Sequence, residues 1–114
     1  MGDAEFHVAE GRVVITWTPE GTPFGLISGK LHDTTPRGFE VDWIVRFPGT
    51  LSGVGAEMCA TLLPVIVQRY RLSWVLVKIH DSYKPAWLST MARKFGFVLQ
   101  GREGAMALWR LDLP

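Results

Sequence analysis

The sequence has little cysteine, little net charge and no long apolar run, and each scarcity excludes a class of protein. A single cysteine, Cys59, rules out an internal disulfide framework. A formal net charge of +1 gives no overall attraction to nucleic acid or to an acidic membrane. The apolar run at residues 62–67 is too short to cross a bilayer and contains Pro64. We therefore expect a soluble, cytoplasmic protein with neither a membrane nor a nucleic acid as its partner.

Histidine is scarce as well, with only 3 in the chain. His7, His32 and His80 have no zinc-ligand spacing among themselves or with Cys59, so no metal site is predicted. The N-terminus lacks a basic segment followed by an apolar one, so no targeting signal is expected. What is present, 47% apolar and 20% charged residues, is typical of an ordered globular protein. We expect one domain over residues 1–114.

A strand, a glycine-bearing turn and a helix follow one another in the middle of the chain. Residues 40–47 are rich in β-branched and aromatic side chains, which predicts a strand. The helix 53–70 is predicted by apolar residues that recur every four positions: Val54, Met58, Leu62, Ile66 and Tyr70. First-turn amides lack partners within a helix, and Gly53 and Gly55 would let an anion approach them. The turn thus favours a phosphate site, although a tight turn or a packing contact would also explain the glycines.

The other elements surround this unit. Further strands are predicted over residues 5–9, 12–17, 24–31, 73–79, 97–101 and 105–111, and a second helix is predicted between the loop at 80–84 and Gly96. The strands up to residue 47 form an antiparallel meander, in which two glycines weaken the strand 24–31 or mark a bulge. The unbroken apolar run at 73–79 suits a buried strand parallel to 40–47. The fold class is α/β (α+β), with a mixed, mostly antiparallel twisted sheet, a central parallel βαβ unit and two helices.

This order of elements resembles the GNAT superfamily of acyl-CoA-dependent N-acyltransferases over residues 38–111. The phosphate turn of that family reads Gln/Arg-x-x-Gly-x-Gly/Ala, and the same slots here are held by Thr50, Leu51, Ser52, Gly53, Val54 and Gly55. The second helix of the family ends in Lys-x-Gly-Phe. Lys94-Phe95-Gly96-Phe97 matches that element, and Gly101 follows it in the closing hairpin.

The resemblance implies where acyl-CoA would bind. The strands 40–47 and 73–79 would splay apart, and the pantetheine arm would lie between them. Backbone groups near Val45, Arg46 and Phe47 would pair with that arm. The pyrophosphate would be held at the phosphate turn by Thr50, Leu51, Ser52, Gly53, Val54, Gly55 and Ala56. Thr50 departs from the family's Gln or Arg, which removes a charged or amide side chain that shapes the turn.

The acyl transfer needs a base for the amine proton. Glu40 and Asp42 are the first candidates, because strand alternation would turn them to one face with Ile44 and Arg46. His80, just beyond the strand 73–79, is the third. Each of the three would also fit as an ordinary surface or ion-paired residue.

A proton donor for the leaving thiolate is less clear from the sequence. Ala92 stands where many members of the family have the tyrosine that serves this role. Tyr83, His80 or Ser89 would have to replace it, although Tyr83 and Ser89 also suit a loop and a helix cap. We carry Glu40, Asp42, His80 and Tyr83 forward as catalytic candidates.

Two functions follow from the resemblance. The first is an acetyl-CoA-dependent N-acetyltransferase acting on an amine of a small molecule or protein. Its acceptor site would be open, or completed by a second copy or a partner protein, because this chain lacks the two helices that usually follow the first strand of the family. The alternative is a non-catalytic interaction or structural module, for example in a phage or virion. An exposed patch at Trp17, Trp43 or Trp87, and a plugged cleft beside Val45, would favour the alternative.

Overall fold

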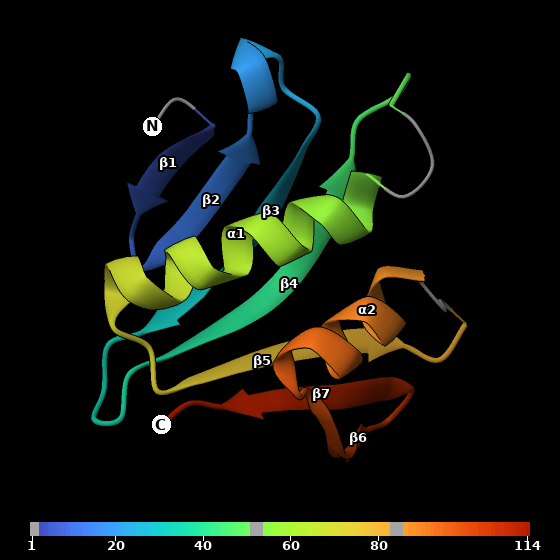
Figure 1. Cartoon of the computed structure of the whole chain (residues 1–114). Helices are drawn as coiled ribbons and strands as arrows, with labels where there is room; N and C mark the ends of the chain where they lie inside the picture. Colours follow the sequence, from blue (N-terminus) through green and yellow to red (C-terminus); the bar gives the residue numbers. More distant parts are fainter. Residues whose placement is uncertain (1–2, 51–53, 83–85) are drawn as a thin grey trace.

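Seven strands and two helices make up the part of the chain that the computed structural model describes, residues 3–50, 54–82 and 86–114 (Figure 1). In chain order they are β1 (Ala4–Ala9), β2 (Arg12–Trp17), β3 (Gly25–His32), β4 (Gly38–Arg46), α1 (Val54–Tyr70), β5 (Trp74–His80), α2 (Ala86–Phe95), β6 (Val98–Glu103) and β7 (Met106–Asp112), with a 3-10 turn at Pro19–Gly21. Every predicted strand and helix is confirmed, with ends within two residues of the prediction. None of the helices in these ranges is long and apolar enough to cross a membrane.

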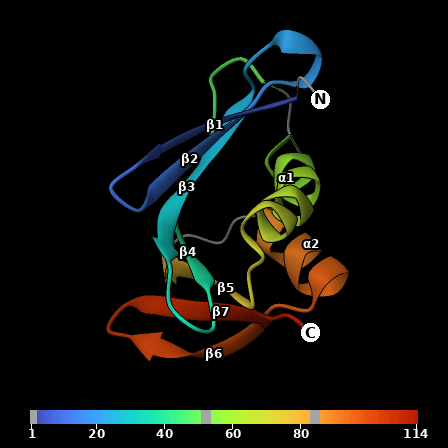
Figure 2. The same ribbon diagram turned by 90° about the vertical axis from the view of Figure 1, so that its left-hand side faces the viewer.

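The strands form one mixed sheet in the order β1-β2-β3-β4-β5-β7-β6. Only the central β4–β5 pair is parallel, and every other neighbouring pair is antiparallel. Both helices lie on the same face of this sheet (Figure 2). No helix of the described residues covers the opposite face, which we call the open face. The predicted α+β class and the parallel βαβ unit are confirmed.

A two-residue turn joins β1 directly to β2. Glu10 and Gly11 have φ of 53° and 78°, so both adopt the left-handed backbone conformation that a type I′ hairpin turn requires. Gly11 adopts it without strain, because it has no Cβ atom. No helix therefore stands between β1 and β2 in the described residues.

A β-bulge interrupts the pairing of β3 with β4. Ser28 pairs with Trp43 and Gly29 pairs with Val41, so Asp42 is an extra residue on β4. A Cβ atom on Gly29 would lie 2.5 Å from a β4 carbonyl oxygen, which explains why glycine stands at the bulge. Of the two readings of the β3 glycines, a weakened strand or a bulge, the structure shows a bulge beside Gly29, with its extra residue on β4.

The bulge reverses the alternation of side chains along β4. Phe39 and Val41 are buried before it, and Ile44 packs against the same core after it. The prediction that residues 40, 42, 44 and 46 share one face is therefore wrong. One extra residue shifts a period-two pattern by one position, and the sequence of β4 alone does not show where that happens.

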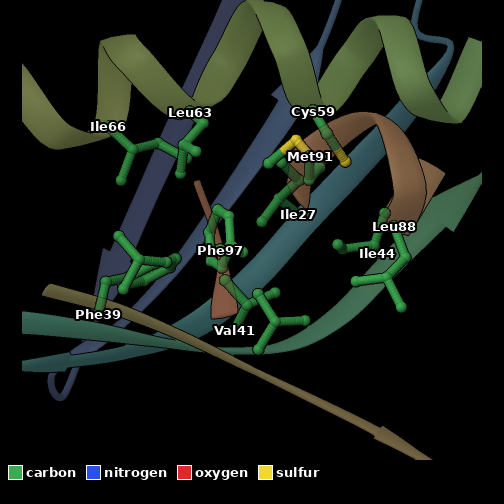
Figure 3. Close-up of a pocket in the computed structure, with 12 residues that line it drawn as sticks. Ile27, Phe39, Val41, Ile44, Cys59, Leu63, Ile66, Leu88, Met91 and Phe97 are labelled. Atoms are coloured by element: carbon green, nitrogen blue, oxygen red, sulfur yellow. The ribbon is translucent and has the colours of Figure 1, made fainter. Parts of the chain in front are cut away.

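The core fills the space between the sheet and the two helices. Its fully buried members come from strands and helix alike: Phe39, Ile15, Met58, Leu62, Ile66, Val13, Val75 and Cys59. The core contains a void of about 20 Å³. Figure 3 shows apolar side chains of β3, β4, α1 and α2 that line it. Pro64 lies exposed on the outer side of α1, as predicted, where the loss of one helical hydrogen bond is tolerated.

Cys59 belongs to this core and is 0% exposed. Burial raises the pKa of its thiol from the ordinary value of 9.0 to about 12, because the thiolate would be desolvated. The side chain therefore stays a neutral thiol at physiological pH, which excludes a nucleophilic role and confirms the prediction of a small core residue.

We expect stability to fall with alkaline pH because of Cys59. The folded protein keeps the thiol proton up to about pH 12, whereas the unfolded chain loses it above 9.0. The free energy of unfolding should decrease by about 1 kcal/mol between pH 9 and 10 from this group. Urea unfolding at both pH values measures it, and Cys59→Ala is the control that should lack this decrement. An equal decrease in the variant would show that other groups cause it.

Candidate acyl-CoA groove

A groove opens where β4 and β5 separate. Their pairing runs from Gly38–Trp74 to Val41–Val77 and then ends, although both strands continue. The groove has a volume of about 670 Å³. Its walls come from β4, β5 and β7: Val41, Asp42, Trp43, Ile44, Val45, Arg46, Val77, Lys78, Ile79, His80 and Met106. The predicted splay is confirmed, and the cleft beside Val45 is open.

The peptide groups of β4 divide between its two sides. The Phe47 amide donates to the Phe24 carbonyl (2.9 Å), so it faces away from the groove. Because peptide groups alternate along a strand, those of Ile44 and Arg46 face the groove. Val45 and Arg46 both line the groove, but the peptide groups of Val45 and Phe47 face β3. Of the three residues predicted to offer backbone groups to the pantetheine arm, only Arg46 turns them to the groove. Ile44 was missed, because choosing between odd and even residues requires the register with β3.

A tight turn follows β4. The Phe47 carbonyl accepts hydrogen bonds from the Thr50 amide (3.4 Å) and from the Thr50 hydroxyl (2.8 Å). Gly49 has φ of 86°, which a type II turn requires at its third residue, and Pro48 suits the second. The Thr50 hydroxyl thus donates its hydrogen within the turn. Its contribution is to hold the turn, and its oxygen remains able to accept.

The N-terminal end of α1 lies beside the end of β4 (Figures 1 and 2). Gly55 and Ala56 are half-buried in its first turn, and Glu57 is exposed. The first-turn amides of a 17-residue helix attract anions. The predicted phosphate ligands Leu51, Ser52 and Gly53 lie outside the described residues, as does the side chain of Val54.

Glu40 belongs to an ion-pair cluster on the open face. Its carboxylate lies 3.3 Å from Lys78 Nζ and 3.3 Å from His32 Nε2, and Lys78 also lies 3.5 Å from Glu103. The hydrogen bond from Lys78 to Glu40 raises the pKa of Lys78 above its ordinary value. Glu40 is not among the groove-lining residues, whereas its partner Lys78 is. Lys78 therefore lies between the Glu40 carboxylate and the groove.

Asp42 reaches the groove and is paired as well. Arg12 donates to its carboxylate from β2, and the same guanidinium lies 3.5 Å from Ser28 Oγ. The Asp42 side chain is 33% exposed despite this pairing. Of the two predicted carboxylate bases, Asp42 is therefore the one that lines the groove.

His80 lies at the end of β5 on the opposite wall. The Ser82 amide donates to His80 Nδ1 (3.1 Å), and the Ser82 hydroxyl lies 2.7 Å from the same nitrogen. Because an amide N–H can only donate, this geometry assigns the hydrogen of the neutral ring to Nε2. In that tautomer His80 carries a hydrogen-bond donor at Nε2, and the residue lines the groove. Tyr83 and the side chain of Ser89 lie outside the described residues.

The tryptophans named above differ in exposure. Trp17 is 4% exposed and packs edge-on against Phe24, with ring centroids 5.9 Å apart. Trp43 is 65% exposed and lines the groove. The side chain of Trp87 lies outside the described part. The exposure of Trp43 is a feature expected of the interaction module, whereas its place in the wall of an open groove is a feature expected of the acyltransferase.

Comparison with known proteins places the fold. The sequence matches no protein-family model and no curated protein sequence. The N-acetyltransferase PseH of Campylobacter jejuni matches 93% of this chain and 71% of its own, with a TM-score of 0.74 and 12% identity. The PaiA N-acetyltransferase of Thermoplasma acidophilum, in complex with coenzyme A, matches 90% of this chain and 62% of its own, with a TM-score of 0.65 and 13% identity.

A third structure is close to this chain in length. A GNAT family acetyltransferase from Elizabethkingia anophelis with acetyl-CoA bound matches 96% of this chain and 97% of its own, with a TM-score of 0.67 and 10% identity. The protein therefore has the fold of the GNAT N-acetyltransferases, which confirms the resemblance at the level of fold.

Proposed function

We propose that this protein is an N-acetyltransferase that uses acetyl-CoA and transfers its acetyl group to an amine. The observation that carries the proposal is the open groove between β4 and β5 beside the N-terminal end of α1. The Elizabethkingia anophelis structure supports it, because a chain matched over 97% of its length is described with acetyl-CoA bound.

Different parts of the groove would bind different parts of acetyl-CoA. Peptide groups of Ile44 and Arg46 would pair with the amides of the pantetheine arm, and the first-turn amides of α1 would hold the pyrophosphate. The thioester would then lie near Asp42 and Trp43. Since both helices cover the other face, an amine would arrive from the open face.

The chemistry requires one bond to form and one to break. The amine nitrogen attacks the thioester carbonyl carbon, a C–N bond forms, and the C–S bond breaks. Asp42 would accept the proton that the nitrogen loses, and that proton would pass through solvent to the coenzyme A thiolate. The Nε2–H of His80 would donate a hydrogen bond to the departing sulfur. Holding the two reactants together would contribute much of the rate enhancement.

Isothermal titration with acetyl-CoA tests the proposal. We expect micromolar binding, and Val45→Glu should weaken it by about 30-fold or more, because a carboxylate would enter the groove (~2 kcal/mol). Val14→Glu is the matched control, since Val14 is also half-buried but does not line the groove.

The control should bind acetyl-CoA like the unchanged protein. No detectable heat at millimolar acetyl-CoA would overturn the proposal, and the fold would then act as a scaffold. Equal weakening by both substitutions would show that the ligand does not lie between β4 and β5.

A further inference from the structure

Trp43 is a large aromatic side chain that this fold leaves in solvent. It is 65% exposed, whereas Trp17 is 4% exposed. Regular alternation along β4 would place it in the core with Phe39 and Val41, and the bulge at Asp42 turns it outward instead. Burying an indole is one of the larger stabilising contributions available to a small core. The fold forgoes that contribution at Trp43, which indicates a role outside the core.

The position of Trp43 suggests what that role is. It lines the groove just beyond Val41–Val77, the last pair between β4 and β5. An amine approaching a thioester in the groove from the open face would pass this indole. The aromatic face attracts an ammonium group and stacks with a second ring.

The charges beside Trp43 restrict the kind of amine. Asp42 is paired with Arg12, and Glu40 is paired with Lys78. Lys78 also pairs with Glu103. The further ammonium groups of a polyamine would have to displace Arg12 and Lys78 to reach the carboxylates. An acceptor with a single ammonium group and an aromatic body meets the indole without displacing either cation. The surroundings therefore favour an aromatic monoamine over a polyamine.

We propose that the acceptor is an arylalkylamine and that Trp43 selects it by stacking on its ring. This inference rests on the N-acetyltransferase function proposed above. The bound ammonium first releases one proton to solvent. The neutral amine nitrogen then attacks the thioester carbonyl carbon, the C–N bond forms and the C–S bond breaks. The second proton of the nitrogen goes to Asp42, and the coenzyme A thiolate leaves and takes a proton from solvent. Trp43 contacts the substrate and takes no part in the proton transfers.

The test measures acetyl transfer with saturating acetyl-CoA and either phenethylamine, tryptamine or spermidine. Release of the coenzyme A thiol is followed by a thiol reagent, and acetylated product is identified by mass spectrometry. We expect kcat/KM for phenethylamine and tryptamine to exceed that for spermidine at least tenfold. Trp43→Ala should lower kcat/KM for the arylalkylamines at least tenfold through KM. Trp43→Phe should keep kcat/KM for the arylalkylamines within about fivefold of the value for the unchanged protein, because a ring remains for stacking.

Val98→Ala is the matched control, since Val98 is also 65% exposed but lies on β6, away from the groove. It should leave all three substrates unaffected. Titration of the unchanged protein with acetyl-CoA separates the two proposals, because acetyl-CoA binding without a preference for arylalkylamines would contradict the acceptor inference alone. If the unchanged protein did not bind acetyl-CoA, the proposed N-acetyltransferase function would be overturned. Three results would overturn the acceptor inference although acetyl-CoA binds normally. Spermidine could be the preferred substrate, none of the three amines could be acetylated, or Trp43→Ala could lower kcat/KM equally for all three amines.

Discussion

Replacing Gly55 with glutamate is expected to abolish acetyl-CoA binding without harming the fold. Gly55 lies in the first turn of α1, where the proposed pyrophosphate site lies. A carboxylate there would repel the pyrophosphate and occupy the helix N-terminus in its place. We expect the dissociation constant to rise at least 100-fold, which corresponds to about 2.7 kcal/mol. Isothermal titration measures the change.

Gly55→Glu should weaken acetyl-CoA binding but leave the stability of the fold equal or higher. Glycine within a helix costs roughly 1 kcal/mol relative to alanine, and an acidic residue in the first turn interacts favourably with the helix dipole. Gly55→Glu should therefore unfold at the same or a higher urea concentration than the unchanged protein. This opposition separates a lost binding site from a damaged fold.

Thr61→Glu is the control for this substitution. Thr61 is exposed on the same helix, about 9 Å further along its axis. It adds the same charge away from the amides of the first turn, so binding should be unchanged. If Gly55→Glu bound acetyl-CoA normally, the pyrophosphate would not lie at the N-terminal end of α1.

Replacing Gly38 with alanine should have the largest effect on stability. Gly38 is buried at the start of the β4–β5 pairing, directly opposite Trp74. A Cβ atom at this position would lie 1.8 Å from Trp74 Cε2. The overlap should destabilise the protein by roughly 2–3 kcal/mol. That loss would lower the melting temperature by about 10 °C, which calorimetry measures.

Trp74 has little room to move away from a methyl group. Its Nε1 donates to the Pro36 carbonyl (3.3 Å). Its ring lies 5.3 Å from the His32 ring, and the Arg110 guanidinium lies 4.9 Å from its centroid. Relief of the overlap would therefore disturb other contacts of the open face or the β4–β5 pairing itself.

Gly101→Ala is the matched control on another strand. A Cβ atom on Gly101 would have no neighbour within 4 Å, and its backbone does not require glycine. Its stability should stay within about 0.5 kcal/mol of the unchanged protein. Adding Trp74→Ala to Gly38→Ala should cost less than the two separate losses combined, because the overlap disappears with the indole. Purely additive losses would show that the Gly38–Trp74 contact is not the cause.

Much of the architecture could be read from local sequence patterns. Alternation of apolar residues located the strands, and the four-residue recurrence from Val54 to Tyr70 located α1, because those periods reflect which side of an element is buried. Glycine and proline marked the turns through their backbone preferences. The groove could be predicted only through the resemblance, since no local pattern states that two paired strands will separate.

The residues of the site show where local reasoning ends. Glu40 and Asp42 look equivalent in the sequence, yet the structure pairs one with Lys78 and the other with Arg12, and only Asp42 lines the groove. Arg12 lies 30 residues before Asp42 in the chain, so no local spacing could have suggested their pairing. His80 is a base candidate by residue type, and only the structure shows that the Ser82 amide donates to its Nδ1.

The sequence by itself determined the strands, the helices, their order and the buried state of Cys59, because these depend on periodicity and composition along the chain. Only the tertiary structure decided the bulge at Asp42, the exposure of Trp43 and the partners of each charged side chain. These depend on which strand lies beside which, and in what register. A shift of one residue in that register exchanges the two faces of β4, and so decides which side chains meet the core and which meet a substrate.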